Sequence, residues 1–161
     1  MRCSRVAVIA VSGLLLGCSG YSEPDADNEL PRAEAALEVP APVGPPRSVW
    51  SGVYSPEQGA RGRQAYVDAC SGCHLPDLSG GGVAPPLRGD AFLVERYGST
   101  VGDLHALIRS TMPLDQAFSL SPQTYVDILA YVLSENGIPS GDTELQASQE
   151  FLDLIRIDSV G

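Results

Sequence analysis

The most regular pattern of apolar side chains in the chain lies in residues 121–136 and predicts a helix. Apolar side chains recur there at spacings of three and four residues, at Tyr125, Ile128, Leu129, Val132 and Leu133. A Ser-Pro pair opens this stretch, and the same pair opens a second expected helix over residues 55–69. A shorter helix is expected over residues 103–110, and no strand pattern of comparable strength is present. The sequence therefore predicts a small all-α domain with long Gly- and Pro-rich connections.

The N-terminal residues have the pattern of an export signal. A short basic stretch is followed by an apolar run from Val6 to Leu16, which is too short for a comfortable membrane span. The run ends in Leu-Leu-Gly-Cys, which resembles the lipobox of bacterial lipoproteins. This resemblance implies that residues 1–17 are a signal peptide and that Cys18 is lipidated. Ser19 favours the outer membrane, with the protein on the periplasmic side, while an ordinary secretory signal and an uncleaved anchor are the alternatives.

Composition divides the remaining chain into three parts. Residues 18–49 are rich in Pro and carboxylates and lack apolar periodicity, which predicts a semi-extended tether. The folded domain is expected over residues 50–137, and residues 138–161 form a C-terminal extension that could wrap the domain or bind a partner. The formal net charge is -10 and the chain contains no Lys, which disfavours a nucleic-acid partner. Membrane contact is expected through the lipid anchor only.

The sequence Cys-Ser-Gly-Cys-His at residues 70–74 matches C-x-x-C-H, the attachment motif of a c-type haem. Two thiols at this spacing can reach the two vinyl groups on one porphyrin edge, and His74 can then ligate the iron. The motif predicts one haem c, bound covalently through Cys70 and Cys73. Two alternatives stand beside it: a structural zinc site, which needs more ligands than His105 alone can add, and a redox dithiol, which normally sits in a βαβ context.

Met112 is the candidate ligand for the opposite face of the iron. It is the only methionine after Met1, and Pro113 follows it and stiffens the loop that must hold the sulfur in place. A thioether ligand opposite His favours ferrous iron and raises the reduction potential. His105 is the alternative ligand, but it is expected to be a partly exposed residue of the helix over 103–110.

With these features the chain resembles the class I cytochromes c, which are monohaem electron carriers. The resemblance covers residues 56–137 and implies a small all-α fold in which three or more helices wrap around one haem. In this family the first and last helices cross closely, and a small residue of one faces an aromatic residue of the other. Gly62 and Tyr131 match that pair.

The resemblance also implies roles for the segment that follows a run of three glycines at residues 80–82. In the family a proline carbonyl here accepts a hydrogen bond from the axial His, and Pro85 is the best match, with Pro86 the nearest competitor. Leu87 is expected to pack on the porphyrin. Three aromatic side chains are expected to line the haem pocket or to join the general core: Phe92, Tyr97 and Phe118.

The expected function is one-electron transfer outside the cytoplasm, without catalysis, because His74 and Met112 together leave no open position on the iron. Residues 138–145 resemble the tails of cytochrome domains that accompany quinoprotein alcohol dehydrogenases, which implies such a dehydrogenase as donor. The alternatives are a general carrier to a terminal oxidase or reductase and, in another class, a haem-based gas or redox sensor. The absence of Lys excludes docking through a basic ring, so redox partners must be basic, neutral or apolar at the contact.

Overall fold

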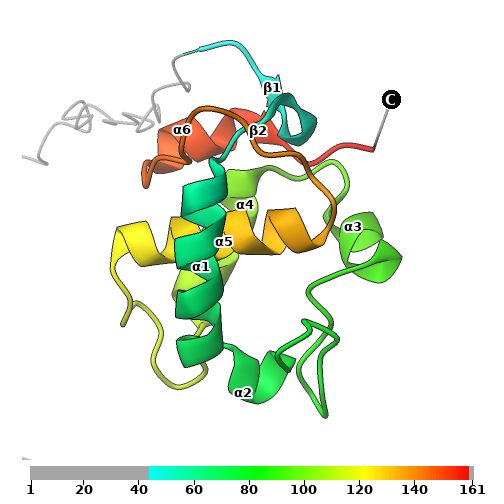
Figure 1. The fold of residues 1–161 in the computed structure, drawn as a ribbon, viewed down its shortest axis with the longest axis vertical. Coiled ribbons are helices and arrows are strands. Elements are labelled where there is room, and N and C mark those ends of the chain that lie inside the picture. The colour runs from blue at the N-terminus through cyan, green and yellow to red at the C-terminus, as the bar shows by residue number, and fades with distance from the viewer. Residues whose placement is uncertain (1–43, 160–161) are drawn as a thin grey trace, which may run out of the picture. The chain divides into compact units, whose positions relative to one another are not determined.

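The computed structural model describes residues 44–159, and the expected signal peptide, the lipidation site Cys18 and most of the expected tether lie outside them. The described chain is mostly helical, which is compatible with an all-α fold (Figure 1). The elements in order are β1 Arg47–Ser48, a 3-10 turn Val49–Ser51, α1 Pro56–Ala69, α2 Ser71–His74, α3 Asp90–Arg96, α4 Val101–Thr111, α5 Pro122–Glu135, α6 Gln149–Asp153 and β2 Ile155–Arg156. Between residues 44 and 159, no helix combines the length and apolar character that crossing a bilayer requires.

The three helices expected from the sequence are present. The Ser55 side chain accepts a hydrogen bond from the Gln58 backbone N–H at the start of α1, and Ser121 does the same for Thr124 at the start of α5. Helix α4 begins two residues earlier than expected, because Thr100 and Asp103 form a capping box around its first turn. Helices α2 and α3 were not expected, since both are too short to show an apolar period.

Helices α1 and α5 cross in close contact (Figure 1), and Gly62 stands at the crossing. A Cβ atom on Gly62 would collide with the backbone carbonyl of Asp127 and would lie 3.0 Å from the Cβ of Tyr131. The rings of Tyr66 and Tyr131 pack at a centroid distance of 5.4 Å beside it. The close approach of the two backbones therefore requires glycine here, as the pairing of Gly62 with Tyr131 predicts.

The segment after α5 packs onto the domain. The side chains of Leu145, Leu152, Ile155 and Ile157 are buried in the same core as α1 and α5. Strand β2 pairs with β1 in parallel, so the two ends of the described chain are joined (Figure 1). The sequence left open whether this segment wraps the domain or binds a partner, and the structure has it wrapped around the domain.

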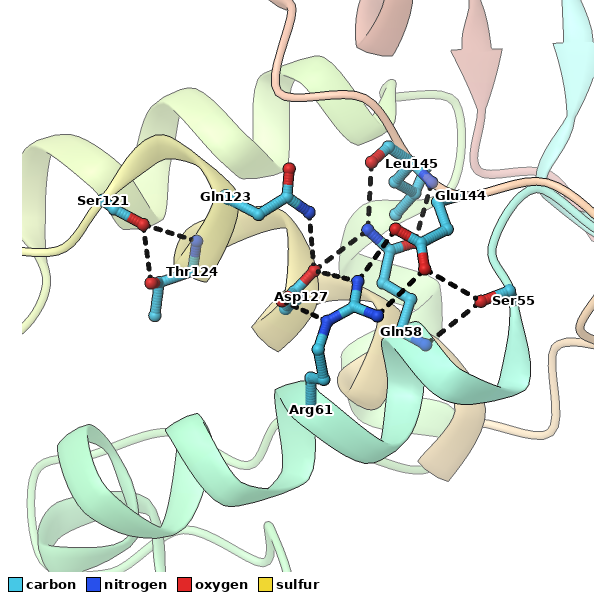
Figure 2. A network of polar contacts seen from close by, with 9 residues as sticks. All are labelled: Ser55, Gln58, Arg61, Ser121, Gln123, Thr124, Asp127, Glu144 and Leu145. Atoms are coloured by element: carbon cyan, nitrogen blue, oxygen red, sulfur yellow. Dashed lines mark hydrogen bonds and ion pairs between the residues drawn. The ribbon is translucent and has the colours of Figure 1, made fainter.

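A polar network fastens this segment to the start of α1 (Figure 2). The Gln58 side chain donates to the Leu145 carbonyl at 2.9 Å and accepts from the Leu145 backbone N–H at 2.7 Å. Arg61 forms ion pairs with Asp127 at 3.1 Å and with Glu144 at 2.8 Å. Asp127 is buried, and it also accepts hydrogen bonds from Gln58 and Gln123, so the carboxylate is well satisfied.

Candidate cofactor site

The C-x-x-C-H motif is wound into a single helical turn directly after α1. The Cys70 backbone N–H donates to Tyr66 at 2.8 Å and ends α1, and the Cys70 carbonyl accepts from the backbone N–H of His74 at 3.0 Å. Cys70 is half-buried and Cys73 is exposed, and both are free thiols. The turn therefore presents two thiols and one imidazole from adjacent positions.

His74 is buried, and its Nδ1 atom lies 2.9 Å from the carbonyl oxygen of Pro85. A carbonyl only accepts hydrogen bonds, so this contact places the ring proton on Nδ1 and leaves Nε2 with its lone pair. Gly80 makes the contact possible because its backbone is left-handed (φ +76°), and a Cβ atom there would lie 2.6 Å from the Ala84 carbonyl oxygen. The loop thus closes tightly enough to bring Pro85 over the imidazole.

Leu87 is fixed from two sides. Its backbone N–H donates to the Leu78 carbonyl at 2.9 Å, and its carbonyl accepts from the side chain of Asn136 at 2.9 Å. Asn136 also accepts from the Gly89 backbone N–H, so the end of α5 holds this loop. The sequence indicated Asn136 only as a helix end, because a contact across 49 residues leaves no local signal.

Met112 ends α4, on a different element from the motif. Its backbone N–H donates to Ile108 at 2.8 Å, and its carbonyl accepts from the Tyr125 hydroxyl at 3.0 Å. Tyr125 belongs to α5, so α4 and α5 together fix the position of the thioether-bearing residue. The sequence predicted Tyr125 only as a helix-face residue, and nothing local pointed to this hydrogen bond.

One cavity collects all six residues that the sequence singled out. It has a volume of about 320 Å³ and a mostly apolar wall, to which α4 and α5 contribute aliphatic side chains. The predicted residues on its wall are Cys70, Cys73, His74, Pro85, Leu87 and Met112. Such a cavity offers an apolar ligand two thiols, an imidazole and a thioether.

Two of the three aromatic residues expected in the pocket lie elsewhere. Phe92 is buried and lines the cavity, whereas Tyr97 and Phe118 are exposed and do not. Tyr97 falls at the end of α3, and Phe118 lies on the outside of the loop after α4, where Arg109 stacks on its ring. Sequence spacing alone could not separate the inner face of these short elements from the outer one.

The expectation that His105 is partly exposed was wrong. His105 is buried because α6 covers α4, and its Nδ1 lies 3.1 Å from the Gln149 side-chain oxygen. It is absent from the cavity wall. Among residues 44–159, no group of three or more His, Cys, Asp or Glu side chains is arranged to hold a metal ion.

The environment of Cys70 bears on the redox-dithiol alternative. Burial, with a smaller contribution from the neighbouring Cys73, raises the pKa of the Cys70 thiol to about 11. Reactive dithiols work through a thiolate stabilised at low pKa. Cys70 in this environment is protonated at neutral pH, which is the opposite of what a dithiol catalyst needs.

The chain is similar to a thiosulfate dehydrogenase of Stutzerimonas stutzeri (strain A1501). The two are 32% identical over 137 residues, which is 73% of this chain and 45% of the relative. The chain therefore spans less than half the length of that relative. No protein-family profile and no solved structure matches the chain.

Proposed function

We propose that the protein is a c-type cytochrome that carries single electrons outside the cytoplasm. The observation that supports this most is the meeting of the C-x-x-C-H turn, Pro85, Leu87 and Met112 in one apolar cavity. In the sequence these residues are up to 42 positions apart, the separation between Cys70 and Met112. The similarity to a protein named a dehydrogenase also supports a redox role.

The residues of the cavity fit a covalently attached haem. Cys70 and Cys73 would hold it through thioether bonds, and His74 and Met112 would ligate the iron. A bound haem supplies a couple between ferric and ferrous iron. Pro85 keeps the His74 tautomer that can ligate, and the mostly apolar walls would pack against the porphyrin.

This ligand set makes the protein a carrier rather than a catalyst. His74 and Met112 would both hold the iron, so no coordination position would be left for a substrate. The exposed Cys73 marks the side on which a redox partner would approach. The donor could be a quinoprotein dehydrogenase, and the acceptor a terminal oxidase or reductase, all contacted transiently.

The proposal includes a lipid anchor at Cys18, which would hold the protein at the periplasmic side of a bacterial outer membrane. A Cys18→Ser variant should then be released into the soluble periplasmic fraction, while a Ser19→Ala variant should stay with the membrane. Retention of the Cys18→Ser variant would point to an uncleaved N-terminal anchor in place of the lipid.

The similarity to a thiosulfate dehydrogenase brings in a second candidate function, the oxidation of thiosulfate. In that case the haem of the isolated protein should be reduced on addition of thiosulfate alone. A carrier should remain oxidised until a separate dehydrogenase and its substrate are added. Rapid reduction by thiosulfate alone would replace the carrier proposal with the enzymatic one.

The first experiment is the absorption spectrum of the dithionite-reduced protein with and without CO, after expression in a host that matures c-type haem. The carrier proposal expects a c-type spectrum that CO does not change. In a Met112→Ala variant the haem should stay attached, CO should bind and the reduction potential should fall. Leu114→Ala is the matched control, since it also removes an apolar side chain from the cavity wall but no ligand.

Three outcomes would contradict the proposal. A wild-type spectrum that shifts with CO would indicate an open iron and favour a sensor or an enzyme. An unchanged potential in Met112→Ala would remove Met112 from the ligand set. If the wild-type protein carries no haem in a host that matures a control cytochrome, the C-x-x-C-H motif would be better explained as a redox dithiol or a zinc site.

A further inference from the structure

A histidine outside the cavity lies buried where α4 packs against α5 and α6. His105 of α4 is 3% exposed, and its Nδ1 atom lies 3.1 Å from the side-chain oxygen of Gln149 in α6. The amide nitrogen of Gln149 donates to the Asp153 carboxylate at 2.7 Å. A carboxylate only accepts hydrogen bonds, which fixes the amide so that its oxygen faces the imidazole. Nδ1 of His105 therefore carries the ring proton and donates it to Gln149.

The hydrogen bond to Gln149 is the one polar contact that the imidazole makes within residues 44–159. The Nε2 atom of His105 is buried and has no hydrogen-bond partner in that range. Buried polar atoms normally have a partner, so this ring is held by fewer polar contacts than its burial leads one to expect. Gln149 therefore sets the orientation of the buried ring.

Helix α6 is fitted closely to α4 at this position. Gly102 lies three residues before His105, and a Cβ atom on Gly102 would collide with the Asp153 carboxylate. The same Cβ atom would lie 2.8 Å from the Gln149 amide nitrogen. The surface of α4 thus leaves room for the two side chains of α6 that fix the imidazole.

On the side of α5, the imidazole packs against Tyr125. The two ring centroids are 6.3 Å apart and the ring planes are 83° apart, which is an edge-to-face arrangement. Tyr125 is buried, lines the cavity and donates from its hydroxyl to the Met112 carbonyl at 3.0 Å. A continuous series of contacts therefore leads from Gln149 on α6 to the backbone of Met112.

We propose, resting on the proposed function, that Gln149 and His105 are positioning residues for Met112 as a ligand of the haem iron. Gln149 holds the imidazole against the Tyr125 ring, and the Tyr125 hydroxyl holds the backbone that carries the thioether. Neither Gln149 nor His105 lies on the cavity wall, so both act through Tyr125. The C-terminal segment would thereby strengthen a ligand of the iron as well as wrap the domain.

This role predicts an effect on the strength of the thioether ligand. When the imidazole loses its hydrogen bond, Tyr125 is held less firmly and Met112 leaves the iron more often. The net worth of one hydrogen bond corresponds to at most about a tenfold change in an equilibrium. Imidazole added to the ferric protein competes with Met112 for the iron, so the midpoint imidazole concentration should fall by up to about tenfold.

The test titrates the haem-loaded ferric protein with imidazole and follows the weak far-red absorption band that a thioether ligand gives to ferric haem. Gln149→Ala removes the acceptor at an exposed position, where truncation leaves the fold intact. Gln146→Ala is the matched control, because Gln146 is an exposed glutamine of the same segment. The midpoint should fall in Gln149→Ala and stay at the wild-type value in Gln146→Ala.

Two further variants show whether the effect passes through His105. Gln149→Glu/Asp153→Asn exchanges donor and acceptor between the two α6 side chains but keeps an acceptor for Nδ1, so it should restore the wild-type midpoint. On a His105→Phe background, Gln149→Ala should cause no further change, because no ring N–H is left to lose its acceptor.

Three results would overturn the proposal. The first is a Gln149→Ala midpoint equal to that of Gln146→Ala. The second is an exchange variant that behaves like Gln149→Ala, and the third is an undiminished effect of Gln149→Ala on the His105→Phe background. A wild-type protein that attaches no haem, or whose ferric form lacks the far-red band, would instead contradict the proposed function. That result is distinguishable because it appears before any variant is compared.

Discussion

The two ends of helix α1 differ in how completely the polar side chains around them are paired within the chain. At the first end, Gln58 and Arg61 meet the buried Asp127 and the segment around Glu144 in a closed polar network. At the second end, α1 runs into Cys70 and a cavity of about 320 Å³, where the Nε atom of Arg96 has no acceptor among the described residues.

The difference separates the part of the fold that the chain completes by itself from the part that the proposed haem would complete. The polar end is complete with contacts from the chain alone. The cavity end has apolar walls that gain contacts only when something fills the space. We therefore expect the polar end to fold by itself and the cavity end to depend on the haem.

The largest effect should come from preventing haem attachment. In a Cys70→Ala/Cys73→Ala variant the cavity stays unfilled, and we expect the free energy of unfolding to fall by about 5 kcal/mol or more. Hydrogen exchange should show lost protection in residues 71–120 and better retained protection in the first half of α1 and in α5. Ser71→Ala is the control, since it leaves both thiols in place. Equal stability with and without haem would contradict the comparison.

A smaller effect should come from forcing α1 and α5 apart at their crossing, which lies between the two ends of α1. Gly62→Ala would drive a methyl group into the Asp127 carbonyl, so we expect a loss of about 2 to 3 kcal/mol in urea unfolding of the loaded protein. Gly72→Ala is the control, because a Cβ atom there meets nothing within 4 Å. A Gly62→Ala protein as stable as Gly72→Ala would show that the crossing can open without cost.

The smallest effect should be a change in acid sensitivity at the polar end. The hydrogen bond from Arg61 holds the pKa of the Glu144 carboxyl below its ordinary value of 4.5. A carboxyl with a lowered pKa in the folded state contributes stability above its unfolded pKa and loses it as pH falls through the folded pKa. Wild type should therefore lose more stability than Glu144→Gln between about pH 6 and about pH 3.

Urea midpoints at the two pH values measure this difference. Asp142→Asn is the control, since Asp142 is an exposed carboxylate two residues away. If wild type and Glu144→Gln lose the same stability on acidification, the ion pair between Arg61 and Glu144 contributes nothing at the polar end.

Local signals made the main helices and the motif predictable. Ser-Pro starts and apolar spacing mark α1 and α5 because capping and amphipathicity act within a few residues. The close crossing at Gly62 was also predictable, though from a family resemblance rather than from spacing. The candidate site residues were named from motifs, and the structure brings them to one cavity.

Contacts between residues far apart in the chain could not be predicted from the sequence. Leu145 is buried because Gln58 binds its backbone across 87 residues, and no local pattern encodes that partnership. The burial of His105 depends in the same way on α6, a helix of five residues. The inward placement of Arg96 follows from the direction of α3, which is too short to show an apolar face.

The pairing of β1 with β2 has a geometric consequence for a protein held by its N-terminus. The described chain begins next to this pair, and Figure 1 shows β1 and β2 at the opposite end of the fold from α2, which carries His74. A tether leading into β1 would pull on the pole farthest from the thiols. Under the proposed lipid anchor, the turn that carries His74 would therefore lie at the end of the domain farthest from the point where the tether enters.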